Sequence, residues 1–141
     1  MKRLVALFIL ASLVSAGSPA VVRDWVKNPA GHPIDTTADL FAVGDAHSDY
    51  VHLLRALDAA EIIAGSPEHP EQVRWRGGRS ILISTGDMID KGPRALDVLK
   101  LYQTLRVQAR LAGRDAVLLA GNHEAEFLAN PVAQKGAEPA S

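Results

Sequence analysis

Three short apolar runs, each followed by a glycine and a polar cluster, set the strongest limit on how this 141-residue chain can fold. The runs occupy residues 40–43, 81–83 and 116–120, and glycines at positions 44, 86 and 121 introduce the clusters. Apolar runs of this length predict buried strands rather than helices. Two longer segments between them have apolar residues at spacings of three and four, which predicts amphipathic helices. This order predicts an α/β fold with a mostly parallel sheet built from right-handed βαβ units.

The two predicted helices have recognisable signals at their ends. Asp49 precedes the first helix and belongs to the residue types that cap helix N-termini by accepting backbone N–H bonds. Pro93 suits the first turn of the second helix, and Gly113 is expected to end it. Between the helices, residues 73–75 and 80–84 flank a glycine-containing stretch, and we predict a β-hairpin there.

The ends of the chain are expected to lie outside the folded domain. Residues 1–16 have a basic start, an apolar run and a small-residue cleavage site, the pattern of a secretory signal peptide. We therefore expect an exported protein, periplasmic or secreted, without stable membrane association after cleavage. A membrane anchor is the alternative, although the apolar run is shorter than the roughly 20 residues that cross a bilayer. Residues 17–37 are expected to form an extended lead-in and residues 135–141 a disordered tail.

The composition narrows the chemistry that the domain can perform. A formal net charge of −1 gives no overall field that would attract a polyanion, so we expect no nucleic-acid partner. The chain has no cysteine, which excludes disulfides, thiolate metal sites and cysteine nucleophiles. Any metal must be bound by His, Asp, Asn or Glu, and such ligands suit several first-row divalent ions.

The three polar clusters predict a site for two metal ions. In a parallel sheet the clusters open at one edge, so Asp45 and Asp87 can converge although they lie 42 positions apart (87 − 45). Two divalent ions about 3.5–4 Å apart need a shared anionic ligand, a role that suits Asp87. Asp45 and His47 would complete one ion's ligands, and Asn122 would offer an amide oxygen to the second ion and to phosphate. Each leading glycine is expected to let the backbone turn sharply and to let a metal or phosphate approach.

Further residues of the same clusters predict the chemistry beside the metals. His123 is placed to donate a proton to a leaving oxygen, and Asp90 to fix the His123 ring. Lys91 and Arg94 are predicted to hold phosphate oxygens, although Arg94 fits a solvent-facing helix position equally well. We interpret Glu124 as a residue of the helix start or as a support for the ligands.

The clusters read GDAH, GDMIDKG and GNHE, and they resemble the calcineurin-like metallophosphoesterase motifs GD-x-H, GD-x-x-D-[RK]-G and GNHE in the same order. The resemblance covers about residues 40–128 and is to the phosphoprotein phosphatase branch, with its Shewanella-type and dinucleoside-polyphosphate-cleaving relatives. It implies the N-terminal portion of an α/β/β/α sandwich, here residues 38–134, and a serine/threonine phosphatase-like hydrolase. A hydroxide held by two divalent ions, Mn, Fe or Zn, would attack a phosphorylated protein or small phosphoester. The implied ligands are Asp45, His47, Asp87 and Asn122, with His123 as the acid and Asp90 as its partner.

The sequence also departs from the family pattern. Ser48 stands where a glycine is usual, and Lys91 replaces the usual arginine, which exchanges a two-pronged grip on phosphate for a point charge. Two further histidines that complete the second metal site in the family have no counterpart, because the remaining histidines do not follow a strand as required. Those residues are His32, His52 and His69. We therefore expect a fragment of a longer enzyme. The alternative is a catalytically inactive, truncated module that binds metal or phosphate.

Overall fold

A computed structural model describes residues 22–27, 31 and 33–132. The chain divides into two units, one ending at Asp35 and one beginning at Thr36. In the described part of the first unit, the Asp24 carboxylate accepts the N–H groups of Val26 and Lys27, at 3.0 and 3.1 Å, and closes a turn. The predicted signal peptide, residues 1–16, and the predicted tail, residues 135–141, lie outside the described residues.

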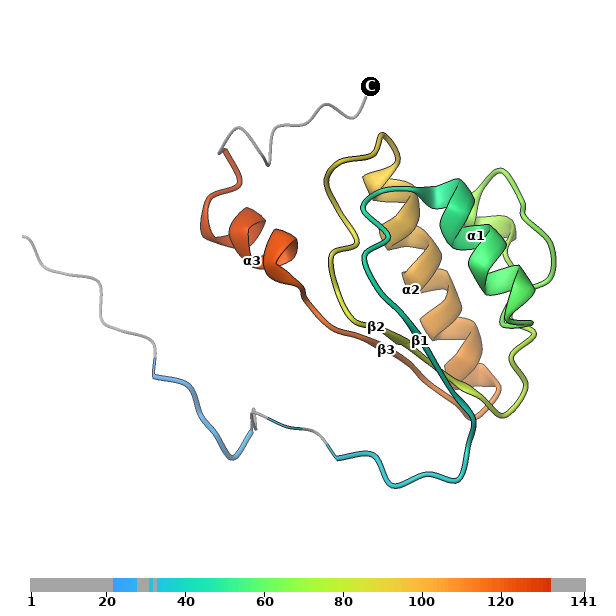
Figure 1. Cartoon of the computed structure of the whole chain (residues 1–141). Coiled ribbons are helices and arrows are strands. Elements are labelled where there is room, and N and C mark those ends of the chain that lie inside the picture. Colours follow the sequence, from blue (N-terminus) through green and yellow to red (C-terminus); the bar gives the residue numbers. More distant parts are fainter. Residues whose placement is uncertain (1–21, 28–30, 32, 133–141) are drawn as a thin grey trace, which may run out of the picture. The chain divides into compact units, whose positions relative to one another are not determined.

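Three parallel strands form the sheet of the second unit, in the order β1-β2-β3 (Figure 1). They are β1 (Leu40–Val43), β2 (Ile81–Ser84) and β3 (Ala116–Leu118). All three predicted strands are confirmed, with β3 two residues shorter than its apolar run. The central strand β2 is the most buried of the three, because it has a neighbour on each side.

Two helices connect the strands, α1 (Tyr50–Ala59) between β1 and β2 and α2 (Ala95–Leu111) between β2 and β3. Both helices lie on one face of the sheet, as Figure 1 shows. Crossovers of one hand between strands in sequential order produce this arrangement. Leu57 of α1, Leu82 of β2 and Leu101 of α2 are fully buried where these layers meet. The predicted α/β class is therefore confirmed. Among the described residues, no helix combines the length and the apolar character needed to cross a bilayer.

The predicted helix ends agree with the structure. The Asp49 carboxylate accepts the backbone N–H of His52 at 3.0 Å and caps α1. This hydrogen bond lowers the pKa of Asp49 below its usual value. Helix α2 begins shortly after Pro93 and is followed by Gly113, whose φ of 72° is the left-handed conformation that glycine favours after a helix.

The predicted β-hairpin around residues 76–79 is wrong. Both edges of β2 are occupied by parallel partners, so the segment before it has no edge to pair with. Trp75 instead forms an isolated antiparallel bridge with Ile63, and its backbone N–H donates to Gln108 Oε1 at 2.7 Å. The segment before the glycines therefore contacts α2 rather than the sheet, and the turn at the glycines leads into β2. A single turn of 3-10 helix, Pro70–Gln72, lies in the preceding connection.

Candidate metal centre

The three polar clusters meet at the carboxyl ends of the strands. The pairing of β1 with β2 continues beyond the strands, because the N–H groups of His47 and Ser48 donate to the carbonyls of Asp87 and Met88, both at 2.9 Å. The third cluster opens helix α3 (Asn122–Ala129), where the N–H of His123 donates to Asp87 Oδ1 at 3.1 Å. The predicted convergence of the clusters is therefore present.

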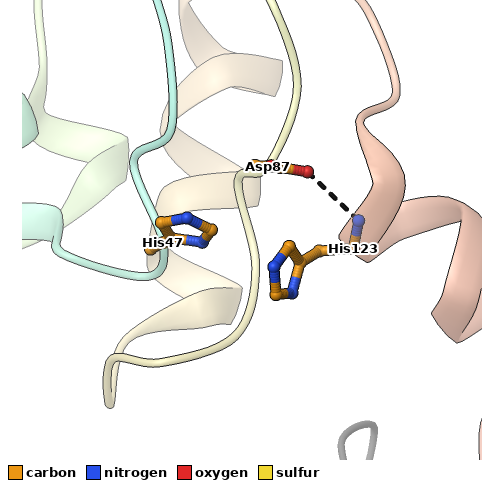
Figure 2. A group of neighbouring side chains, drawn as sticks. All are labelled: His47, Asp87 and His123. Atoms are coloured by element: carbon orange, nitrogen blue, oxygen red, sulfur yellow. Dashed lines mark hydrogen bonds between the residues drawn. The ribbon is translucent and has the colours of Figure 1, made fainter.

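Two imidazoles and a carboxylate face one another at the centre of this region. His47, Asp87 and His123 each offer a ligand atom, and these atoms lie within 4.8 Å of one another (Figure 2). The two rings meet edge to face, with centroids 4.8 Å apart and planes at 76°. This donor set of nitrogens and a carboxylate oxygen fits Mn, Fe or Zn. The ring of His123, predicted to be a proton donor, thus also lies within reach of an ion bound at this centre.

Asp45 lies at the rim of the centre. Its Oδ2 is 3.8 Å from His47 Nε2, and its side chain is 71% exposed. The carboxylate is therefore next to the predicted ligand nitrogen and open to solvent. Asn122, the first residue of α3, is also exposed. The ligand roles of Asp45 and Asn122 stay predictions.

His123 and Asp90 form a close pair. The distance from His123 Nδ1 to Asp90 Oδ2 is 2.7 Å, and the side chains are 11% and 14% exposed. A carboxylate in this position fixes the imidazole ring and its tautomer. The geometry that the proposed acid requires is thus present before any substrate binds.

The two predicted phosphate-binding cations have different surroundings. Lys91 Nζ lies 2.9 Å from His47 Nε2 and lines an open pocket of about 510 Å³ together with Asp45 and His47. Arg94 is held by other groups: Nε donates to Asp97 Oδ2 at 2.7 Å, and the guanidinium lies 4.2 Å from the centre of the Tyr50 ring. A phosphate contact by Arg94 stays a prediction, and it would compete with these interactions.

Strained backbone gathers in the first two clusters. Seven non-glycine residues of the described chain have positive φ, and all but Glu61 lie in these two clusters or directly after the first. They are Asp45, His47, Ser48, Asp87, Asp90 and Lys91. Such conformations cost about 1–3 kcal/mol each and persist where the surroundings enforce them, often at functional sites.

The expected role of the leading glycines needs correction. Of the three, only Gly86 has a positive φ, 106°, whereas the sharp turns are made largely by the polar residues themselves. A Cβ at Gly86 would collide with the backbone of Gly121, and a Cβ at Gly121 would collide with the Asp87 carboxylate. Gly86 and Gly121 therefore make room for the neighbouring loop. The expected approach of a metal or phosphate at the glycines stays a prediction.

Glu124 forms more hydrogen bonds within the site than the sequence indicated. Its carboxylate accepts N–H groups from Gly121, at the start of its own helix, and from three consecutive residues of the second cluster. The sequence signal is its position three residues after the helix cap, where a Glu reaches back to the cap N–H. That signal does not reveal the three bonds to the other loop.

The fold and the site together define an α/β protein with a candidate metal centre at the carboxyl ends of parallel strands. More particularly, residues 39–139 match the family model of the calcineurin-like phosphoesterases, and the chain belongs to that family. The strand order, the convergence of the clusters and the donor set are thus features of a family member.

Several known proteins are similar to this chain. Shewanella-like protein phosphatase 2 of Arabidopsis thaliana is 33% identical over 85 residues, 60% of this chain and 20% of the relative. A symmetrical bis(5'-nucleosyl)-tetraphosphatase of an Enterobacter species is 30% identical over 63% of this chain and 24% of the relative. The crystal structure of a cold-active protein-tyrosine phosphatase from a psychrophilic Shewanella species matches with a TM-score of 0.55 and 33% identity, over 67% of this chain and 28% of that one. The chain therefore spans about a quarter of the length of these relatives.

Proposed function

We propose that this chain supplies the first metal ligands and the proton donor of a phosphatase that hydrolyses phosphate esters with two divalent ions. The observation that carries the proposal is the meeting of His47, Asp87 and His123 within 4.8 Å, with Asp90 hydrogen-bonded to Nδ1 of the His123 ring. Family membership and the phosphatase names of the relatives support the same reaction class.

Asp45, His47, Asp87 and Asn122 are the residues that would hold the ions. Divalent ions at such a site act as Lewis acids toward phosphate and lower the pKa of bound water, which provides a nucleophile near neutral pH. Asp87 is suited to a shared position because its Oδ1 is already oriented by the His123 N–H. Lys91 brings a positive charge to the open pocket, where it would attract the non-bridging oxygens of a phosphate.

His123 would protonate the leaving oxygen in this scheme. Asp90 keeps a proton on Nδ1 and stabilises the charged ring, so that Nε2 can give up its proton to the leaving group. The His123 side chain is only 11% exposed, which limits exchange of that proton with bulk water.

Two classes of substrate fit this reaction. One is a phosphoprotein with serine/threonine or tyrosine esters, and the other is a small phosphoester or a dinucleoside polyphosphate. The names of the relatives point in each of these directions. The N-terminal pattern supports the further proposal that the protein is exported. An inactive module that binds metal or phosphate is the second candidate, because the described residues bring together a single group of possible metal ligands, His47, Asp87 and His123.

Replacement of Asp87 by Asn tests the proposed metal centre. The Asn retains an oxygen to accept the His123 N–H but loses the charge, so we expect at least about 10-fold weaker Mn²⁺ binding by calorimetry with unchanged circular dichroism. Asp58→Asn is the matched control, because Asp58 also accepts a backbone N–H, from Gly65, but does not belong to the His47–Asp87–His123 cluster. Equal Mn²⁺ affinity in the two variants would contradict the role of Asp87. Release of p-nitrophenol from p-nitrophenyl phosphate with Mn, Fe, Co or Zn separates the enzyme from the inactive module.

A further inference from the structure

Glu124 connects two loops of the site through a carboxylate that accepts four hydrogen bonds. Oε1 accepts the N–H groups of Met88 and Ile89, at 2.7 and 3.1 Å. Oε2 accepts those of Asp87 and Gly121, both at 2.8 Å. Both carboxylate oxygens thus accept two hydrogen bonds, and all four donors are backbone groups.

Three of these donors form a concave anion site. Asp87, Met88 and Ile89 are consecutive, and the left-handed conformation of Asp87, with a φ of 51°, helps to turn their N–H groups toward one point. Successive N–H groups in such a conformation bind anions, phosphate among them. Here the anion is the protein's own carboxylate, delivered from a residue 35 to 37 positions away.

Helix capping accounts for only one of the four bonds. A Glu at the third helical position reaches back to the cap N–H, which here is that of Gly121. The other three bonds join α3 to the loop after β2, and they add nothing to the helix end. Their effect is to fix the position of Asp87 relative to α3, which carries His123.

The side chain of Asp87 completes a closed set of contacts. Its Oδ1 accepts the N–H of His123, the residue directly before Glu124. The main chain of Asp87 is therefore held by Glu124 and its side chain by His123. We propose that Glu124 is a positioning residue that sets the Asp87 carboxylate and the His123 ring at the spacing an ion requires. The metal-related part of this inference rests on the proposed function.

Glu124→Gln is the informative variant, because an amide offers one acceptor oxygen and turns an NH₂ group toward the remaining donors. Glu126→Gln is its control, with the same loss of charge two residues further along α3 at an exposed position. We expect the amide protons of Asp87, Met88 and Ile89 to shift and to lose exchange protection only in Glu124→Gln. We also expect Mn²⁺ affinity to fall about 10- to 100-fold in that variant and less than about 2-fold in Glu126→Gln.

The outcomes are distinguishable. Equal Mn²⁺ affinity in the two variants, or a lower melting temperature of Glu124→Gln with wild-type Mn²⁺ affinity, overturns the positioning role. If Glu124→Gln does not fold, Glu124→Asp replaces it as the test variant, because it keeps the charge but shortens the side chain. A loss of Mn²⁺ affinity in a folded Glu124→Asp variant supports the positioning role. Wild-type affinity in that variant overturns it. A wild-type chain that binds no Mn²⁺ overturns the proposed function. The positioning of Asp87 is then tested alone by the chemical shifts and exchange protection of the amide protons of residues 87–89 in Glu124→Gln, and unchanged values overturn it.

Discussion

His123 Nδ1 and Asp90 Oδ2 lie 2.7 Å apart, although 33 positions separate the two residues in the sequence. A carboxylate can only accept a hydrogen bond, so Nδ1 carries the proton and Nε2 is left for the reaction. The loop that contains Asp90 reaches this position with a φ of 68° at Asp90, a conformation in which Asp and Asn are enriched. Asn is therefore a substitute that keeps the backbone and removes the charge.

We predict that loss of His123 acts on the leaving group. In an active preparation, His123→Asn should lower kcat for an alkyl phosphate by about 10²–10⁴-fold, the usual contribution of a general acid. The loss for p-nitrophenyl phosphate should be much smaller, because p-nitrophenolate leaves without a proton. Asp90→Asn should show the same preference with an effect of about 10- to 100-fold. Equal losses on both substrates would mean that His123 acts as a metal ligand instead.

Replacement of Ser48 by Gly should stabilise the chain. Ser48 is fully buried with a φ of 61°, and its Oγ has no hydrogen-bond partner in the structure. Glycine removes about 1–2 kcal/mol of strain and an unpaired hydroxyl, against an entropic cost of about 0.5–1 kcal/mol. We expect a net gain of about 1 kcal/mol, seen as a melting temperature about 4 °C higher.

Ser84→Gly is the control for this prediction. Ser84 is also buried, but it lies in the central strand β2, with its hydroxyl next to that of Tyr102. Glycine has no strain to relieve in a strand, removes the hydroxyl next to Tyr102 and adds entropy to the unfolded chain, so this variant should melt at a lower temperature. If both variants melt higher, the hydroxyl rather than the backbone conformation is responsible.

The sequence predicted the parts of the molecule that depend on local patterns and general topology. The runs at residues 40–43 and 81–83 have the length of strands, and parallel strands bring their following loops to one edge, which placed His47 and Asp87 together. The cap at Asp49 was equally predictable, because it depends on the neighbouring N–H groups alone.

Features that depend on contacts between distant segments were not predictable in this way. The glycines at 77 and 78 indicate a turn, but whether a hairpin forms depends on β1 and β3 having already taken both edges of β2. The three bonds from Glu124 to residues 87–89 require the relative position of two loops. The left-handed conformation of Lys91 is also imposed by the surroundings, since lysine does not favour it by itself.

A comparison of alanine substitutions at Gly86 and Gly65 separates the effect of backbone strain from the effect of steric crowding. Both have positive φ, 106° and 71°, so alanine is strained at either position. A Cβ at Gly65 meets no atom within 4 Å, whereas a Cβ at Gly86 collides with the backbone of Gly121. Backbone atoms at the start of α3 cannot rotate away as a flexible side chain would, so the two loops of the site must move apart.

We therefore expect Gly65→Ala to lower the free energy of unfolding by about 1 kcal/mol and Gly86→Ala by about 2 kcal/mol or more in urea denaturation. The variants should also differ in Mn²⁺ binding. Separation of the loops moves Asp87 from the His123 N–H, so Gly86→Ala should bind Mn²⁺ more weakly, whereas Gly65→Ala should keep the wild-type affinity. Equal effects of the two substitutions on stability and on Mn²⁺ affinity would show that the close approach of Gly86 and Gly121 does not determine the geometry of the site.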